Sequence, residues 1–184
     1  DAIHAICRAV FSRGVSVVFG NHPTFRPLIS EVASRFEPKN PRAIIRMYTS
    51  RYFVSPAEVE ALDREAHVLA TPSIDDDRAR SLSEMRKQMI ADGSALALVA
   101  IGGKTGRAAI PPGVDEEVRL ATERKLPVFV LGAVGGRSAE IAAELSAAGW
   151  KPSLNPLSPE DNERLRLSTD FDDLAELILT ALGR

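Results

Sequence analysis

One stretch of the sequence combines an uninterrupted apolar run with a pair of glycines and a lysine. Ala95 to Ile101 are apolar without polar alternation, which is typical of a parallel strand covered by helices on both faces. The run ends at Gly102 and Gly103, where the missing Cβ atoms allow a backbone or a phosphate to approach closely, and Lys104 adds a positive charge. The stretch therefore predicts a strand that ends in an anion-binding loop.

A helix is expected directly after this loop. Pro112 suits a first helical turn, and the acidic run Asp115 to Glu117 complements the positive end of the helix. Helical phase places Glu117 at the edge of the buried stripe. Because open α/β sheets bind ligands at the carboxyl ends of their strands, we interpret Glu117 as an acceptor for a ligand hydroxyl. The alternative is a salt bridge with Lys104 or Arg107.

Size and composition are those of one globular domain. The chain has 184 residues, 45% hydrophobic and 26% charged, with a formal net charge of −2. No apolar run approaches the roughly 20 residues that span a bilayer, and no basic stripe suits nucleic acid. The single cysteine, Cys7, fits a reducing cytoplasm, and the histidines lack metal-ligand spacing. Because the chain starts at Asp1 with a helix pattern and no strand, we expect residues 1–184 to be a single domain excised from a longer multidomain protein.

Strand and helix patterns alternate along the rest of the chain. This alternation predicts an α/β fold, a Rossmann-like doubly wound parallel sheet with helices on both faces. The mixed strand at 43–48 is expected nearer an edge, and the proline-rich stretch 151–159 is expected to be a loop. Further strands are predicted at 15–19, 67–71 and 127–131, and helices at 2–12, 24–36, 56–64, 78–92, up to 145 after the last glycine loop, and 171–182.

Two more predicted strands end at glycines. The first ends at Gly20 and continues into His22-Pro23-Thr24, where Thr24 can cap the next helix. His22 is either a ligand contact or a loop histidine that is hydrogen-bonded to the backbone. The other strand ends at Gly132 and is followed by the Gly135-Gly136 pair.

Arg86 falls inside the apolar stripe of its predicted helix, beside Met85 and Met89. Either its stem passes the core to reach solvent, or its guanidinium meets a carboxylate or phosphate at the rim of the sheet. We favour the second interpretation, because this helix leads directly into the strand at 95–101.

Three glycine loops at strand carboxyl ends, with Arg86, Lys104 and Glu117 nearby, favour a phosphorylated and hydroxylated ligand such as a nucleotide. Neither G-x-x-x-x-G-K-[ST] nor a clean G-x-G-x-x-G is present, which argues against an ATPase or an ordinary dehydrogenase.

These loop segments together resemble the SLOG superfamily. The matching segments are 19–24, 101–105, 112–117 and 131–136, within a resemblance that covers roughly residues 3 to 145. More narrowly, the chain is similar to the sensor SLOG domains of bacterial antiphage effectors of the Thoeris type, whose catalytic partner is a Sir2-like NAD hydrolase. SLOG domains begin with a strand and a serine/glycine turn that this chain lacks.

The resemblance implies a cytoplasmic, homo-oligomeric sensor domain that performs no chemistry and uses no cofactor or metal. Its ligand would be a cyclic ADP-ribose isomer or a related nucleotide, made by a partner TIR-domain protein, and its output an attached or associated effector. Neither nucleic acid nor a membrane is expected as a partner. The ligand-binding positions implied are Gly20, His22, Pro23, Thr24, Arg86, Gly102, Gly103, Lys104, Thr105, Glu117, Gly132, Gly135 and Gly136.

The alternative is an enzyme, because SLOG relatives of the "lonely guy" type are phosphoribohydrolases that cut a base from a nucleoside monophosphate. Their signature is P-G-G-x-G-T-x-x-E. Here Gly102-Gly103-Lys104-Thr105 is followed by the glutamates only some ten residues later, so the signature is interrupted. A DprA-like single-strand binder ranks last, because the basic groove and aromatic platforms of that class are missing.

Overall fold

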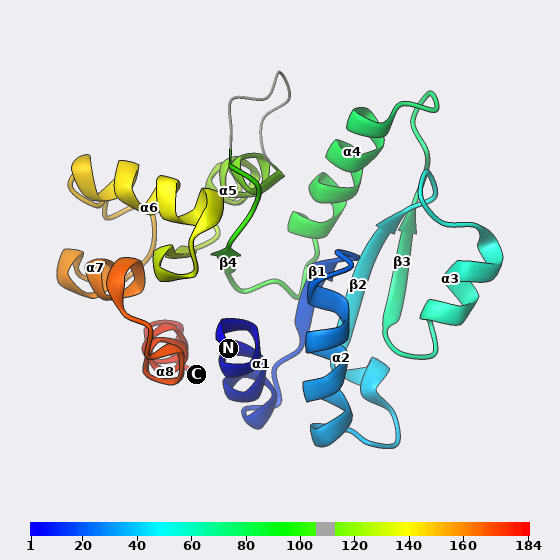
Figure 1. Cartoon of the computed structure of the whole chain (residues 1–184), viewed down its shortest axis with the longest axis horizontal. Helices are drawn as coiled ribbons and strands as arrows, with labels where there is room; N and C mark the ends of the chain where they lie inside the picture. The colour runs from blue at the N-terminus through cyan, green and yellow to red at the C-terminus, as the bar shows by residue number, and fades with distance from the viewer. Residues whose placement is uncertain (106–112) are drawn as a thin grey trace. The chain divides into compact units, whose positions relative to one another are not determined.

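The computed structural model describes residues 1–105 and 113–184, so Arg107 and Pro112 lie outside the described residues. The chain divides into two compact units, Asp1–Met89 and Ile90–Arg184, which we call unit 1 and unit 2 (Figure 1).

Unit 1 contains a parallel three-stranded sheet in the order β1-β2-β3. In register, Val17 lies opposite Ile45, and Arg46 lies opposite His67. Each strand therefore pairs with the next strand along the chain. The elements are α1 (Ala2–Ser12), β1 (Val17–Gly20), α2 (Phe25–Phe36), the 3-10 helix η1 (Pro41–Ala43), β2 (Ile45–Ser50), α3 (Pro56–Leu62), β3 (His67–Thr71) and α4 (Arg78–Ile90).

The expectation that the strand near residues 43–48 lies toward an edge is wrong. β2 is the middle strand and pairs with β1 on one side and β3 on the other. Its last four residues, Met47 to Ser50, are all buried. The polar character that suggested an edge belongs to Arg46, which is half-buried within the strand.

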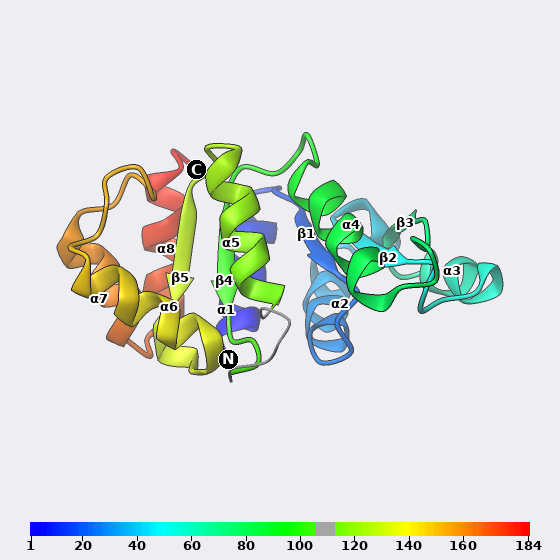
Figure 2. The ribbon, with the colours of Figure 1, turned by 90° about the horizontal axis from the view of Figure 1, so that it is seen from above.

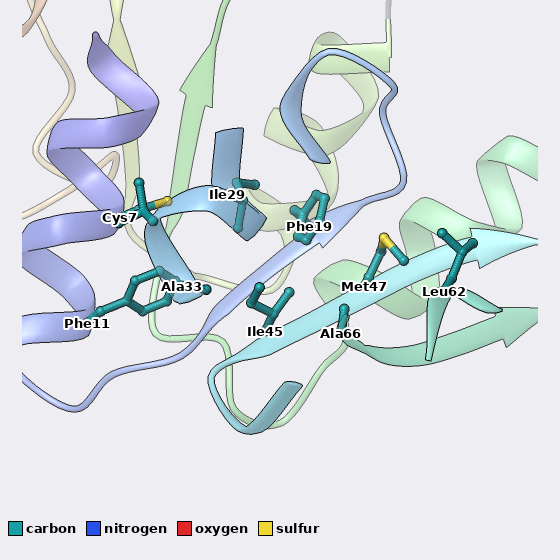
Figure 3. Close-up of a cluster of buried hydrophobic side chains, with 10 residues drawn as sticks. Cys7, Phe11, Phe19, Ile29, Ala33, Ile45, Met47, Leu62 and Ala66 are labelled. Atoms are coloured by element: carbon teal, nitrogen blue, oxygen red, sulfur yellow. The ribbon is translucent and has the colours of Figure 1, made fainter. Parts of the chain in front are cut away.

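The core of unit 1 lies between the α1–α2 pair and the sheet. Cys7 and Phe11 of α1 pack with Ile29 of α2, and the same cluster includes Phe19 of β1 and Ile45 of β2 (Figure 3). α1 and α2 carry the apolar spacing expected of helices that bury one face. Both were predicted from that spacing, and the bounds of α1 agree with the prediction.

Unit 2 contains the parallel pair β4-β5, in which Leu98 lies opposite Val128 and Ile101 opposite Leu131. β4 is shorter than the apolar run that predicted it, since Ala95 donates its N–H to the Asp92 carbonyl in a turn before the strand. Figure 2 shows α5 and α6 in front of the two strands and α8 behind them. The elements are β4 (Leu98–Ile101), α5 (Gly113–Glu123), β5 (Val128–Leu131), the 3-10 helix η2 (Gly132–Val134), α6 (Gly136–Ala147), α7 (Pro159–Leu167) and α8 (Phe171–Ala181).

Helix α7 was missed by the sequence analysis, which predicted no element between the proline-rich loop at 151–159 and the helix at 171–182. Ser158 caps the helix by accepting the Asp161 N–H, and Pro159 occupies the first turn. Buried Asn155 donates to the Val128 carbonyl and to the Asn162 side chain, so the loop and α7 are tied to β5.

Parallel strands with helices around them confirm the predicted mixed α/β, Rossmann-like fold. Within residues 1–105 and 113–184, every helix is too short or too polar to cross a bilayer.

Candidate functional site

The glycine loops that follow β4 and β5 are hydrogen-bonded to each other at the carboxyl ends of these strands. Gly102 donates its backbone N–H to the Ser138 hydroxyl at 2.9 Å, and the Gly102 carbonyl accepts the Ser138 N–H at 2.8 Å. The Gly103 carbonyl accepts the Arg137 N–H at 3.1 Å. Two of the three predicted glycine loops therefore form one continuous surface in unit 2.

These hydrogen bonds use backbone amides at the amino-terminal end of α6. The first amides of a helix have no partner inside the helix and can bind an anion. Here the amides of Arg137 and Ser138 are already bonded to the carbonyl oxygens of Gly103 and Gly102. A phosphate at this edge would therefore meet the loop after β4 rather than these two amides of α6.

Close packing explains why residues 103 and 136 are glycines. Both have positive φ, +93° at Gly103 and +66° at Gly136. A Cβ on Gly136 would overlap the Gly103 carbonyl oxygen, and a Cβ on Gly103 would overlap the Val114 side chain at the start of α5. These glycines are needed for the contact between the loops, whether or not a ligand is bound.

The glycines at 102, 132 and 135 differ in their surroundings. A Cβ on Gly132 would lie 2.8 Å from the Arg166 carbonyl oxygen of α7, so this buried residue is a glycine because a helix packs on it. Among the described residues, and apart from the chain neighbours of each glycine, no heavy atom lies within 4 Å of the Cβ position of Gly102 or Gly135. Space for an approaching ligand is therefore found at Gly102 and Gly135, rather than at Gly132.

Lys104 and Thr105 are exposed directly after the glycine pair, whereas Glu117 is half-buried on α5. The lysine thus presents its charge to solvent beside the loop surface. Whether Glu117 accepts from a ligand or joins a salt bridge stays a prediction, and Arg107, one of the two cations considered for that bridge, lies outside the described residues.

Arg137 makes ion pairs with three carboxylates at this edge, and the sequence analysis did not identify it as a site residue. Its guanidinium contacts Asp115 in the first turn of α5 at 2.7 Å, and Glu140 and Glu144 on its own helix at 3.0 and 2.7 Å. These carboxylates, Asp115 first, raise the pKa of Arg137 above its usual value. A signal was present in the sequence, because a positive charge in the first turn of a helix is disfavoured by the helix dipole and nearby carboxylates offset that effect.

A shallow groove lies beside this ion-pair cluster, between α5 and α6. Its volume is about 290 Å³, and its walls combine the charged groups with the apolar side chains of α5 and α6. The lining residues are Asp115, Val118, Arg119, Arg137, Ile141, Glu144 and Leu145.

The remaining predicted site residues belong to unit 1. Gly20 ends β1, and His22, Pro23 and Thr24 are exposed in the turn before α2. The Nδ1 atom of His22 accepts the Thr24 backbone N–H at 3.3 Å, and the His22 ring lies 5.1 Å from that of Phe25. Of the two roles considered for His22, the structure shows the hydrogen bond to the backbone.

Thr24 occupies the N-cap position of α2, as predicted, but its side chain makes no capping hydrogen bond. The His22 carbonyl instead accepts the N–H groups of Phe25 and Arg26, both at 3.0 Å. Arg86 is half-buried on α4, between the buried residues Met85 and Met89.

In the part of the chain that the structure describes, no group of three or more His, Cys, Asp or Glu side chains is arranged to hold a metal ion.

A comparison with family models gives a match to the SLOG cluster3 family over residues 1–150. The chain belongs to the SLOG cluster3 family. The match confirms the resemblance to the SLOG superfamily, and SLOG membership points to a nucleotide-related function. A search of curated proteins found no match to this SLOG chain.

Proposed function

We propose that this SLOG protein is a sensor that binds a nucleotide-derived second messenger, a cyclic ADP-ribose isomer, and thereby regulates an attached or partner effector in bacterial antiphage defence. The observation that carries the proposal is the surface formed by the two hydrogen-bonded glycine loops, with Lys104 exposed beside it. Membership of a nucleotide-related family supports the ligand class.

The chemistry of this surface suits a pyrophosphate that carries sugars. Lys104 offers a mobile positive charge for a phosphate, and open space at Gly102 and Gly135 lets a phosphate or ribose approach the backbone. Glu117 supplies a carboxylate one helical turn into α5 that suits a ribose hydroxyl. In unit 1, the exposed turn of His22 to Thr24 and the half-buried Arg86 stay predicted ligand contacts that the family resemblance implies.

Regulation by such a sensor requires that the ligand changes contacts between copies of the chain or with the effector. A ligand shifts an equilibrium only when it binds one state more tightly than the other. We therefore propose that the protein forms a homo-oligomer whose assembly responds to the ligand. A cytoplasmic location is part of the same proposal.

Calorimetric titration of the chain with ADP-ribose and with each cyclic ADP-ribose isomer tests the proposal. We expect micromolar or tighter binding of at least one cyclic isomer. Replacing exposed Lys104 by Ala should weaken that binding at least tenfold, because a hydrogen bond to a charged group contributes about 1.5–3 kcal/mol. Lys151→Ala, which removes another exposed lysine of unit 2, is the matched control and should leave the affinity unchanged.

The enzyme alternative has a separate test. The chain is incubated with AMP and other nucleoside monophosphates, and released base is measured by chromatography. No release is expected. Steady release of free base, together with a lack of binding to the cyclic isomers, would replace the sensor by a phosphoribohydrolase.

A further inference from the structure

We propose that Arg137 is the positioning residue of the ligand site. It ties both ends of the connection between β4 and α5 to the start of α6, and thereby keeps Gly102 to Thr105 in the conformation that receives the ligand. This inference rests on the function proposed above, and it adds a residue that makes no ligand contact itself.

The backbone of Arg137 holds the first end of the connection. Its N–H donates to the Gly103 carbonyl at 3.1 Å, one residue before Lys104. The next residue, Ser138, adds the reciprocal pair of bonds with Gly102. The orientation of the loop after β4 therefore follows the orientation of the first turn of α6.

The side chain of Arg137 holds the second end. Its Nε lies 3.0 Å from each carboxylate oxygen of Asp115, and its Nη2 lies 2.7 Å from the Asp115 Oδ1. Asp115 is in the first turn of α5. This fork-shaped contact fixes both distance and angle, which a lysine at the same position would not do.

The guanidinium is saturated by protein carboxylates. Arginine has five N–H donors. Besides the contacts to Asp115, Nη1 donates to Glu140 and Glu144, and Nη2 also reaches Glu144 at 3.4 Å. Every nitrogen of the group thus has a carboxylate partner, so Arg137 would act on the ligand through the loop rather than by binding a phosphate.

The location of Arg137 argues against a purely helix-stabilising role. A positive charge in the first turn of a helix is disfavoured by the helix dipole. Glu140 and Glu144 on α6 offset that effect, but the third carboxylate, Asp115, belongs to another helix. The side chain is only 18% exposed although it is charged. Arg137 therefore links α5 to α6 in addition to stabilising α6.

Amide hydrogen exchange on the full chain without ligand tests the positioning role directly. First-turn amides of a helix ordinarily exchange fast because they have no helical partner, so protection of the Ser138 amide reports its bond to Gly102. In Arg137→Met, which keeps the apolar stem, we expect the Ser138 and Gly102 amides to exchange at least tenfold faster. Arg119→Met is the matched control, since it removes the exposed ion pair to Glu123 on α5 and should leave both amides unchanged.

Binding of cyclic ADP-ribose isomers supplies the second measurement. Arg137→Met should weaken binding at least tenfold while Lys104 is intact. Asp115→Asn should also weaken binding. This variant leaves Arg137 paired with Glu140 and Glu144, so it replaces Arg137→Met in the test if the methionine variant does not fold. Because Arg137 and Asp115 act as a unit, the double variant should be little weaker than Arg137→Met alone.

The outcomes separate the two proposals. Unchanged exchange of the Ser138 and Gly102 amides in a folded Arg137→Met or Asp115→Asn variant overturns the positioning role. Faster exchange with wild-type affinity overturns it as well, since the contact would then be structural only. If the wild-type chain binds no cyclic isomer, the proposed sensor function fails, whereas the exchange rates still decide whether Arg137 holds the loop.

Discussion

Gly102 and Ser138 are joined by two hydrogen bonds that run in opposite directions. The Gly102 N–H donates to the Ser138 hydroxyl at 2.9 Å, and the Ser138 N–H donates to the Gly102 carbonyl at 2.8 Å. The pair connects the end of β4 to the first turn of α6, and the Ser138 side chain is fully buried. The geometry of the candidate ligand surface depends on this contact.

Removal of the Ser138 hydroxyl should therefore destabilise unit 2. Ser138→Ala leaves the Gly102 N–H without its acceptor and removes a donor to the Leu131 carbonyl. Loss of such a buried partner costs about 1–3 kcal/mol, which urea denaturation can measure. Ser153→Ala, at an exposed serine, is the control and should change the free energy of unfolding by less than about 0.5 kcal/mol. Equal effects of the two substitutions would contradict the structural importance of the Gly102–Ser138 pair.

Gly136→Ala should be more destabilising than an equivalent change at a glycine with free space. Both Gly136 and Gly149 have positive φ, +66° and +78°. At Gly149, no heavy atom of the described residues beyond its chain neighbours lies within 4 Å of the Cβ position, so alanine there should cost roughly 1 kcal/mol from its backbone conformation alone. At Gly136 the overlap with the Gly103 carbonyl adds to this, for a total of about 2 kcal/mol or more. The two unfolding free energies, measured side by side, should differ in this order, and a reversed order would be inconsistent with the contact.

Glu163 should make the stability of the protein depend on acid pH. Hydrogen bonds from Ser146, Trp150 and Arg166 lower the pKa of this α7 carboxyl from 4.5 to about 2. A carboxyl with a lowered folded-state pKa stabilises the fold above its unfolded-state pKa. That stabilisation is lost as the pH falls from 4.5 toward 2.

The measurement is the free energy of unfolding of wild type and Glu163→Gln between pH 7 and pH 2.5. The advantage of wild type should be largest near neutral pH and should shrink below pH 4.5. Glu160→Gln, at an exposed carboxylate in the first turn of the same helix, is the control. An advantage that stays constant down to pH 2.5 would show that Glu163 acts only through the shape of its side chain.

Cys7 should be chemically inert while unit 1 is folded. Burial in the α1–α2 core raises the pKa of its thiol to about 12, and its side chain is 2% exposed. The thiolate is the reactive species, so a disulfide reagent at pH 8 should modify Cys7 only at the rate at which the core opens. The measurement is the rate at which a chromogenic disulfide reagent releases its coloured thiol, compared between buffer and guanidinium chloride. Similar rates in both solutions would mean that the core around Cys7 is not formed.

The elements that the sequence predicted well are those whose signals are local. The bounds of α1 follow from its apolar spacing and those of β3 from a short apolar run that ends at Pro72, and both agree with the structure. α7 has an equally local signal in Ser158-Pro159, but the prolines before it suggested a loop. The place of β2 in the middle of its sheet depends on which strands pair, and its composition does not encode that order.

In the candidate site, too, the features with a local sequence pattern were predicted, whereas the contacts between distant residues were not. The glycine pairs at the ends of β4 and β5 were identified from the sequence, because a glycine pair after an apolar run is a local pattern. The bonds between the two loops, and the contact of Arg137 with Asp115, join residues that are 22 to 36 positions apart. They follow from the side-by-side pairing of β4 and β5, which no single stretch of sequence specifies.

The strand order of unit 1 matters for how this protein emerges from the ribosome. The order of the strands in the sheet, β1-β2-β3, is also their order along the chain. When β2 or β3 leaves the exit tunnel, the strand with which it pairs has therefore already emerged. All the ladder hydrogen bonds of this sheet use residues up to Thr71, so the sheet can be complete while the residues that form unit 2 are still being translated.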